Sequence, residues 1–194
     1  MNSIIVVPKN SGLRAYRQIA LSSMDINGSK IIEARGEDVP SLVYEFSSLG
    51  KQTLGLTGED LYREWCLGNR RGGLSVVQRI VWNDPSAMFG KPTLCLLGPE
   101  GKGLDDVPPI PTVCINAKYK NMSRRFLNAL ERQGYTFRKT YLNGCVEMAC
   151  AEGISDLVID IVYTGDSMRD NKLQVYQKIF GSDFLVIGGA NGSA

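Results

Sequence analysis

The chain has 194 residues, of which 43% are hydrophobic and 22% are charged, which is ordinary for a globular protein with a buried core. Its formal net charge of +2 is too small to indicate a nucleic-acid or membrane partner. The absence of histidine excludes a histidine base, a histidine-ligated metal and a Ser-His-Asp triad. The five cysteines form no Cys-x-x-Cys pair, which favours reduced thiols. No segment resembles a signal peptide or a membrane span, so we expect a cytoplasmic protein.

Short apolar segments alternate with amphipathic ones, a pattern that predicts an α/β fold. In chain order we predict a strand at 4–7, helices at 12–24 and 39–49, strands at 53–56, 74–81 and 93–97, a loop at 98–111, a strand at 112–115, a helix at 121–133, a strand at 137–141, a helix at 144–151 and strands at 157–162, 173–178 and 184–187. The small residues of 188–194 form a tail that cannot pack a core.

The strand predicted at 157–162 is an apolar run interrupted by one acid, Asp160. A run of this kind is typical of a strand buried on both faces, as in a parallel sheet. The turn Thr164-Gly165-Asp166-Ser167 follows, and a helix could begin at Ser167. Backbone amides in such a turn can bind phosphate. A carboxylate near the end of the strand can accept hydrogen bonds from ribose hydroxyls or hold a metal ion. Together these features suit a phosphorylated sugar.

Each of these features has a simpler explanation. An acid inside a buried strand is costly unless it is paired or functional, so Asp160 could instead form a structural salt bridge. The segment from Thr164 to Ser167 could be a plain tight turn.

Three segments of this region, read together, resemble the ATP phosphoribosyltransferase family. The family patterns L-N-G-S-V-E, G-x-x-D and D-x-V-x-T-G-x-T-L correspond to residues 142–147, 153–156 and 160–168. Further similar segments occur in the same order at residues 35–40, 54–58, 89–96 and 123–126. The resemblance extends from residue 4 to residue 187.

The resemblance implies two lobes of the kind found in periplasmic solute-binding proteins, with mixed sheets flanked by helices. It places the crossings between the lobes near 94–98 and near 173. Lobe I would comprise 1–94 and 173–194, and lobe II, with the phosphoribosyl pyrophosphate loop, would comprise 95–172.

The resemblance also implies an Mg²⁺-dependent activity. Phosphoribosyl is transferred from phosphoribosyl pyrophosphate to N1 of ATP with release of pyrophosphate, the first step of histidine biosynthesis. The implied catalytic residues are Asp160 and Glu147. The implied substrate-binding residues are Thr164, Gly165, Asp166, Ser167, Lys9 and Arg35. Two further residues have alternatives, because Glu147 could merely complement a helix dipole and Arg35 could be a solvated cation.

The sequence ends soon after Ile187, which resembles the short form of the family. Short forms depend on a separate regulatory subunit related to histidyl-tRNA synthetase, so we expect an oligomer that is weakly active and insensitive to histidine without that subunit. The alternative is a non-catalytic two-lobe ligand-binding or regulatory paralogue. Asp166, which brings a negative charge into the loop, keeps this alternative open.

Overall fold

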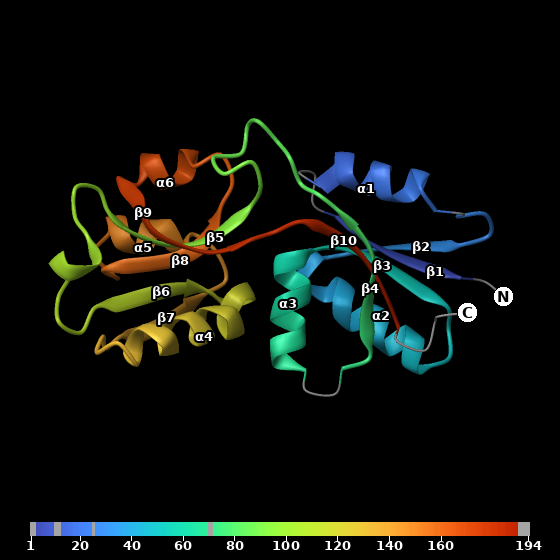
Figure 1. Ribbon diagram of the computed structural model, residues 1–194, viewed down its shortest axis with the longest axis horizontal. Helices are drawn as coiled ribbons and strands as arrows, with labels where there is room; N and C mark the ends of the chain where they lie inside the picture. Colours follow the sequence, from blue (N-terminus) through green and yellow to red (C-terminus); the bar gives the residue numbers. More distant parts are fainter. Residues whose placement is uncertain (1–2, 10–12, 25, 70–71, 190–194) are drawn as a thin grey trace. The chain divides into compact units, whose positions relative to one another are not determined.

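The computed structural model describes residues 3–9, 13–24, 26–69 and 72–189 (Figure 1). The chain forms two compact units, of which unit 1 comprises Met1–Trp82 and Asp183–Ala194, and unit 2 comprises Asn83–Ser182. Each unit contains a five-stranded sheet with both parallel and antiparallel pairs, and helices pack against it. The predicted α/β architecture of mixed sheets flanked by helices is confirmed. No helix in the described ranges is both long and apolar enough to cross a membrane.

Unit 1 contains β1 (Ile4–Pro8), α1 (Arg14–Ser22), β2 (Lys30–Ala34), α2 (Val39–Ser48), β3 (Thr53–Gly58), α3 (Glu59–Gly68), β4 (Leu74–Ile80) and β10 (Phe184–Gly189). The strand order is β2-β1-β3-β10-β4. β1 runs parallel to β2 and β3, whereas β10 is antiparallel to β3 and β4. Helix α2 packs closely on β3, because a Cβ on Gly55 would lie 2.4 Å from Val43 and 2.9 Å from Val39.

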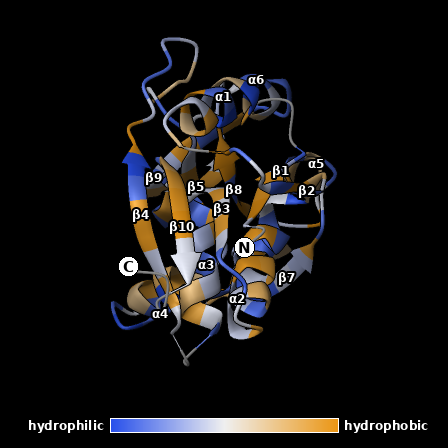
Figure 2. Ribbon diagram, turned by 90° about the vertical axis from the view of Figure 1, so that its right-hand side faces the viewer, coloured by the Kyte–Doolittle hydropathy of each residue, from blue (hydrophilic) through white to orange (hydrophobic). Residues whose placement is uncertain are grey.

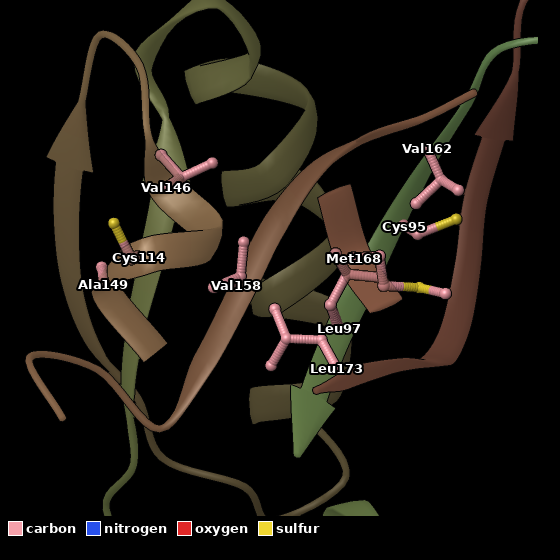
Figure 3. Close-up of a cluster of buried hydrophobic side chains, with 9 residues drawn as sticks. All are labelled: Cys95, Leu97, Cys114, Val146, Ala149, Val158, Val162, Met168 and Leu173. Atoms are coloured by element: carbon pink, nitrogen blue, oxygen red, sulfur yellow. The ribbon is translucent and has the colours of Figure 1, made fainter. Parts of the chain in front are cut away.

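Unit 2 contains β5 (Thr93–Pro99), β6 (Thr112–Asn116), α4 (Lys120–Glu131), β7 (Arg138–Leu142), α5 (Val146–Ala151), β8 (Leu157–Val162), α6 (Asp166–Asp170) and β9 (Leu173–Gly181). The strand order is β7-β6-β8-β5-β9. Among the described residues, the strands supply most of the buried hydrophobic side chains, and their hydrophobic stretches are visible in Figure 2. One core cluster lies between the sheet of unit 2 and helices α5 and α6, and consists of Cys95, Leu97, Cys114, Val146, Ala149, Val158, Val162, Met168 and Leu173 (Figure 3).

The boundaries between the units differ from those we expected. The chain passes from unit 1 to unit 2 after Trp82 and returns after Ser182, and not near 94–98 and 173. The physical reason is that β5 pairs with β8 on one side and with β9 on the other, so both β5 and β9 lie wholly within unit 2. An apolar strand buried in this way is a poor place for a crossing, which falls instead at polar residues such as Asn83.

Three further details differ from the sequence predictions. β8 runs parallel to β6 but antiparallel to β5, so its buried apolar run belongs to a mixed sheet and not to a parallel one. β2 and α3 were not predicted. Gly188 and Gly189, predicted as part of the tail, belong to β10, and residues 190–194 lie outside the described residues.

Candidate functional site

Asp160 lies on β8 next to the end of β6. The two strands are parallel, with Ile115 opposite Ile159, so the following residues Asn116 and Asp160 are also neighbours. The Asn116 Nδ2 donates a hydrogen bond of 2.9 Å to Asp160 Oδ1, and the Ile161 backbone N–H donates one of 2.7 Å to the same oxygen. Both donors are neutral amides. Amide hydrogen bonds, and not a salt bridge, therefore hold Asp160 Oδ1 in place.

The carboxyl group of Asp160 has an unusual acidity. Its pKa is raised from 3.8 to about 6, mainly because the group is buried and in part because the Glu147 carboxylate is nearby. The hydrogen bonds from Ile161 and Asn116 and the charge of Lys118 act in the opposite direction. Keeping this carboxylate ionised at neutral pH therefore costs the folded state free energy, and residues of this kind concentrate at functional sites.

Glu147 lies in the first turn of α5, which begins at Val146, two residues later than predicted. Cys145, directly before the helix, has a left-handed backbone with φ of +54°. Glu147 is half-buried and close enough to Asp160 to affect its pKa. The fold therefore brings together the two acids that the family resemblance implies, although they lie on different elements.

The turn between β8 and α6 requires glycine at position 165. Gly165 is buried and has a φ of +83°, a conformation that L-residues rarely adopt. A Cβ at this position would lie 3.0 Å from Arg169 Nη1 and 3.2 Å from Met88 Sδ. Helix α6 begins at the next residue, Asp166, one residue earlier than predicted, and Ser167 is exposed.

Arg169 is a residue of this turn that the sequence prediction missed. Its Nη2 donates to Asp166 Oδ1 at 2.5 Å and to the carbonyl oxygen of Thr164 at 3.2 Å. Hydrogen bonds from Thr164 and Arg169 lower the pKa of Asp166, so the acid in the loop stays ionised and paired. The i, i+3 spacing of the two charges on one helix was the available signal. Arg169 also lines a pocket of about 580 Å³ against β9.

Lys9 and Arg35 belong to unit 1, whereas the other six candidate residues belong to unit 2. β1 and β2 are parallel and aligned with Pro8 opposite Ala34, so Lys9 and Arg35 follow neighbouring strand ends. The Lys9 backbone N–H donates to the Ala34 carbonyl at 2.9 Å. Both side chains are exposed, which gives unit 1 a pair of cations at one sheet edge.

A protein-only metal site is absent from the described residues, because no group of three or more His, Cys, Asp or Glu side chains is placed to hold an ion. Asp160 and Glu147 therefore provide at most part of a coordination shell. Mg²⁺ commonly binds through one or two carboxylates together with substrate oxygens and water. The two acids fit a metal ion that arrives with its substrate.

Similarity to known proteins agrees with these observations. Residues 35–193 match the family model described as HisG: ATP phosphoribosyltransferase. An ATP phosphoribosyltransferase of Metallosphaera sedula is 29% identical over 192 residues, which are 98% of this chain and 59% of that protein. The chain thus spans about three fifths of the length of this curated relative.

Two solved structures show the same fold at lower identity. The ATP phosphoribosyl transferase (HisG:HisZ) complex of Thermotoga maritima contains a chain that matches with a TM-score of 0.71 at 23% identity, over 96% of this chain and 87% of that one. The periplasmic aliphatic sulphonate binding protein SsuA of Escherichia coli matches with a TM-score of 0.60 at 18% identity, over 95% of this chain and 64% of that one. The predicted likeness to periplasmic binding proteins is therefore confirmed. Because the family model matches most of the sequence, the chain belongs to the ATP phosphoribosyltransferase family.

Proposed function

We propose that this chain catalyses the transfer of phosphoribosyl from phosphoribosyl pyrophosphate to N1 of ATP, with release of pyrophosphate, as the first step of histidine biosynthesis. The observation that carries the proposal is Asp160, an acid retained on a mostly buried strand at a cost to stability and located shortly before the Gly165 turn. Membership of the family supports the same reaction.

In the proposed reaction, N1 of the adenine attacks C1 of the ribose as the bond from C1 to the pyrophosphate oxygen breaks. The transition state carries positive charge on the ribose and growing negative charge on the leaving group. Catalysis then consists mainly of positioning and charge stabilisation, and it requires no covalent nucleophile.

The carboxylates of Asp160 and Glu147 would accept hydrogen bonds from the ribose hydroxyls. Asp160 is suited to this because two amide donors fix its Oδ1 and thereby the orientation of the whole group. With a pKa of about 6, it is mostly ionised at pH 7.5.

The backbone amides from Gly165 to Ser167 would hold the 5-phosphate, because glycine gives the turn the backbone conformation from which helix α6 begins. Thr164 and Ser167 supply hydroxyl groups on either side. Lys9 and Arg35 of unit 1 would supply positive charge for the pyrophosphate. As an alternative to the ribose contact, Asp160 and Glu147 would hold a bound Mg²⁺, which would supply positive charge for the leaving group.

We further propose that activity depends on a separate regulatory subunit. The Thermotoga maritima relative was solved in a complex named HisG:HisZ, which supports a partner for this chain as well. Two joined units can change their conformational equilibrium when a partner binds one state better than the other.

The proposal is tested by incubating the purified chain with ATP, phosphoribosyl pyrophosphate and Mg²⁺ and measuring pyrophosphate and product, with and without the co-expressed partner. We expect little turnover alone, no inhibition by histidine, and a partner-dependent gain of both turnover and inhibition. If phosphoribosyl pyrophosphate binds but no turnover occurs even with the partner, the chain is the non-catalytic paralogue. If the chain alone is fully active and strongly inhibited by histidine, the regulatory part of the proposal is wrong.

A further inference from the structure

The first residues of unit 2 contact the turn that follows β8. The Met88 backbone N–H donates a hydrogen bond of 2.7 Å to the carbonyl oxygen of Tyr163. The Tyr163 hydroxyl donates to the carboxylate of Asp84. Tyr163 directly precedes Thr164, so both its backbone and its side chain connect the start of the Gly165 turn to the segment 84–90.

The segment 84–90 is itself well ordered by local hydrogen bonds. Asp84 Oδ1 accepts from the backbone N–H of Ser86 at 2.8 Å and from its hydroxyl at 2.7 Å. The Asp84 backbone N–H donates to the Gly90 carbonyl, and the Ala87 N–H donates back to the Asp84 carbonyl. Hydrogen bonds from Tyr163 and Ser86 lower the pKa of Asp84, so its bond with Tyr163 is charge-assisted at neutral pH.

The same segment reaches the tightest point of the turn. Met88 Sδ lies 3.2 Å from the position that a Cβ on Gly165 would occupy, and Arg169 Nη1 lies 3.0 Å from that position. Both side chains therefore reach the Gly165 position. Arg169 holds the Thr164 carbonyl, while Asp84 and Met88 hold Tyr163.

We propose that Tyr163 and Asp84 are positioning residues for the phosphate-binding turn, a role that rests on the function proposed above. In this role they act through the backbone of the turn, whose amides at residues 165–167 would bind the phosphate, and not through a contact of their own with the substrate. Because the chain enters unit 2 at Asn83, this contact also couples occupancy of the turn to the segment that follows the crossing. The coupling is reciprocal, so a bound donor stabilises the segment 84–90.

The chain contains a matched control for the chemistry of this pair. The Tyr135 hydroxyl donates to Asp105 Oδ1 at 3.2 Å, a second tyrosine–aspartate pair in unit 2 that lies outside the turn and the segment 84–90. Tyr135→Phe removes the same hydroxyl group as Tyr163→Phe. An effect of Tyr163→Phe that Tyr135→Phe lacks is therefore specific to the turn.

The experiment uses the full chain, with its partner subunit where turnover requires it. Calorimetry gives the Kd for phosphoribosyl pyrophosphate, and kinetics give the KM values for both substrates. We expect Tyr163→Phe to weaken donor binding about tenfold, as for the loss of a hydrogen bond to a charged group. The KM for ATP should change little, because the positioning role concerns the binding of the donor alone. The melting temperature should also change little, because the role is local to the turn. Asp84→Asn should act in the same direction, and Tyr135→Phe should leave donor binding unchanged.

If the wild-type chain and the Tyr163→Phe variant bind the donor equally well, the positioning role is wrong and the proposed function stays intact. The positioning role is also wrong if Tyr163→Phe and Tyr135→Phe weaken donor binding equally. A wild-type chain without donor affinity overturns the proposed function and the positioning role together. Hydrogen exchange at the Met88 amide tests the coupling without any variant: we expect slower exchange with the donor bound, and an unchanged rate contradicts the proposal.

Discussion

Replacing Asp160 by asparagine should stabilise the fold while abolishing the proposed reaction. The folded protein raises the pKa of this carboxyl group from 3.8 to about 6, so its ionised form costs about 3 kcal/mol at neutral pH. Asparagine carries no charge, and its side-chain oxygen can still accept the hydrogen bonds from Asn116 and Ile161. The variant should therefore gain up to about 3 kcal/mol at pH 7.5, or roughly 2–4 °C in Tm for each kcal/mol.

The gain in the free energy of unfolding of Asp160→Asn should increase as the pH rises. The folded state binds the Asp160 proton more tightly than the unfolded chain, so the contribution of this group to stability decreases as the pH rises from about 4 to about 6. Above that range the free-energy cost of the ionised Asp160 is constant, and below it this cost disappears because the group is protonated in both states. Urea denaturation of both proteins at several pH values should show the largest difference above pH 6 and almost none near pH 4.

The same proteins should be assayed for turnover, which Asp160→Asn should reduce by at least about a hundredfold if the charge acts on the ribose. Asp156→Asn is the control, because this half-buried acid on the segment before β8 accepts a hydrogen bond of 2.8 Å from the Thr112 backbone N–H. It should keep normal turnover. If Asp160→Asn is less stable at pH 7.5 and has normal kinetics, Asp160 is a structural residue and the reasoning is refuted.

Three further changes test other parts of the structure. Gly165→Ala should lower stability by about 1–3 kcal/mol because of its positive φ, and should weaken donor binding measured by calorimetry; unchanged affinity would contradict the phosphate turn. Asp166→Asn should weaken donor binding, because Arg169 loses the carboxylate that holds it beside the Thr164 carbonyl; tighter binding at low salt would show that the negative charge of Asp166 only opposes the anion. Arg79→Met should destabilise unit 1 by about 2 kcal/mol in urea denaturation, because the buried Glu59 and Asp183 lose their shared cation. An unchanged stability would show that the two ion pairs of Arg79 are fully solvated.

The predicted strands were recognised wherever burial is complete. β1, β8 and β10 are almost entirely buried, and their apolar runs are visible in the sequence. β2 was missed because its Lys-Ile-Ile-Glu-Ala sequence is short and has no clear alternation of apolar and polar residues. Helix α3 was missed because its buried residues include the charged Glu59 and Asp60, which a hydrophobic pattern does not detect.

The candidate site was predictable only in part for a related reason. An acid inside an apolar run is conspicuous because burying it is costly, and this identified Asp160. Its partner Asn116 lies 44 residues away, and only the register of β6 with β8 brings the two together. Asp84 and Tyr163 are 79 residues apart, and no local pattern connects them. Contacts made by sheet register or by loop packing leave no periodic signal in a single sequence.

The negative charge of Asp166 was the main reason to doubt that the turn binds an anion. In the structure this side chain is exposed and pairs with Arg169, so the pair adds no net charge to the turn. The same guanidinium holds the Thr164 carbonyl, and thus the acid helps to position a cation that orders the backbone. Ser167 remains exposed and keeps the hydroxyl of the family pattern. The departure at position 166 is therefore compatible with phosphate binding, and it does not favour a chain that has lost its substrate.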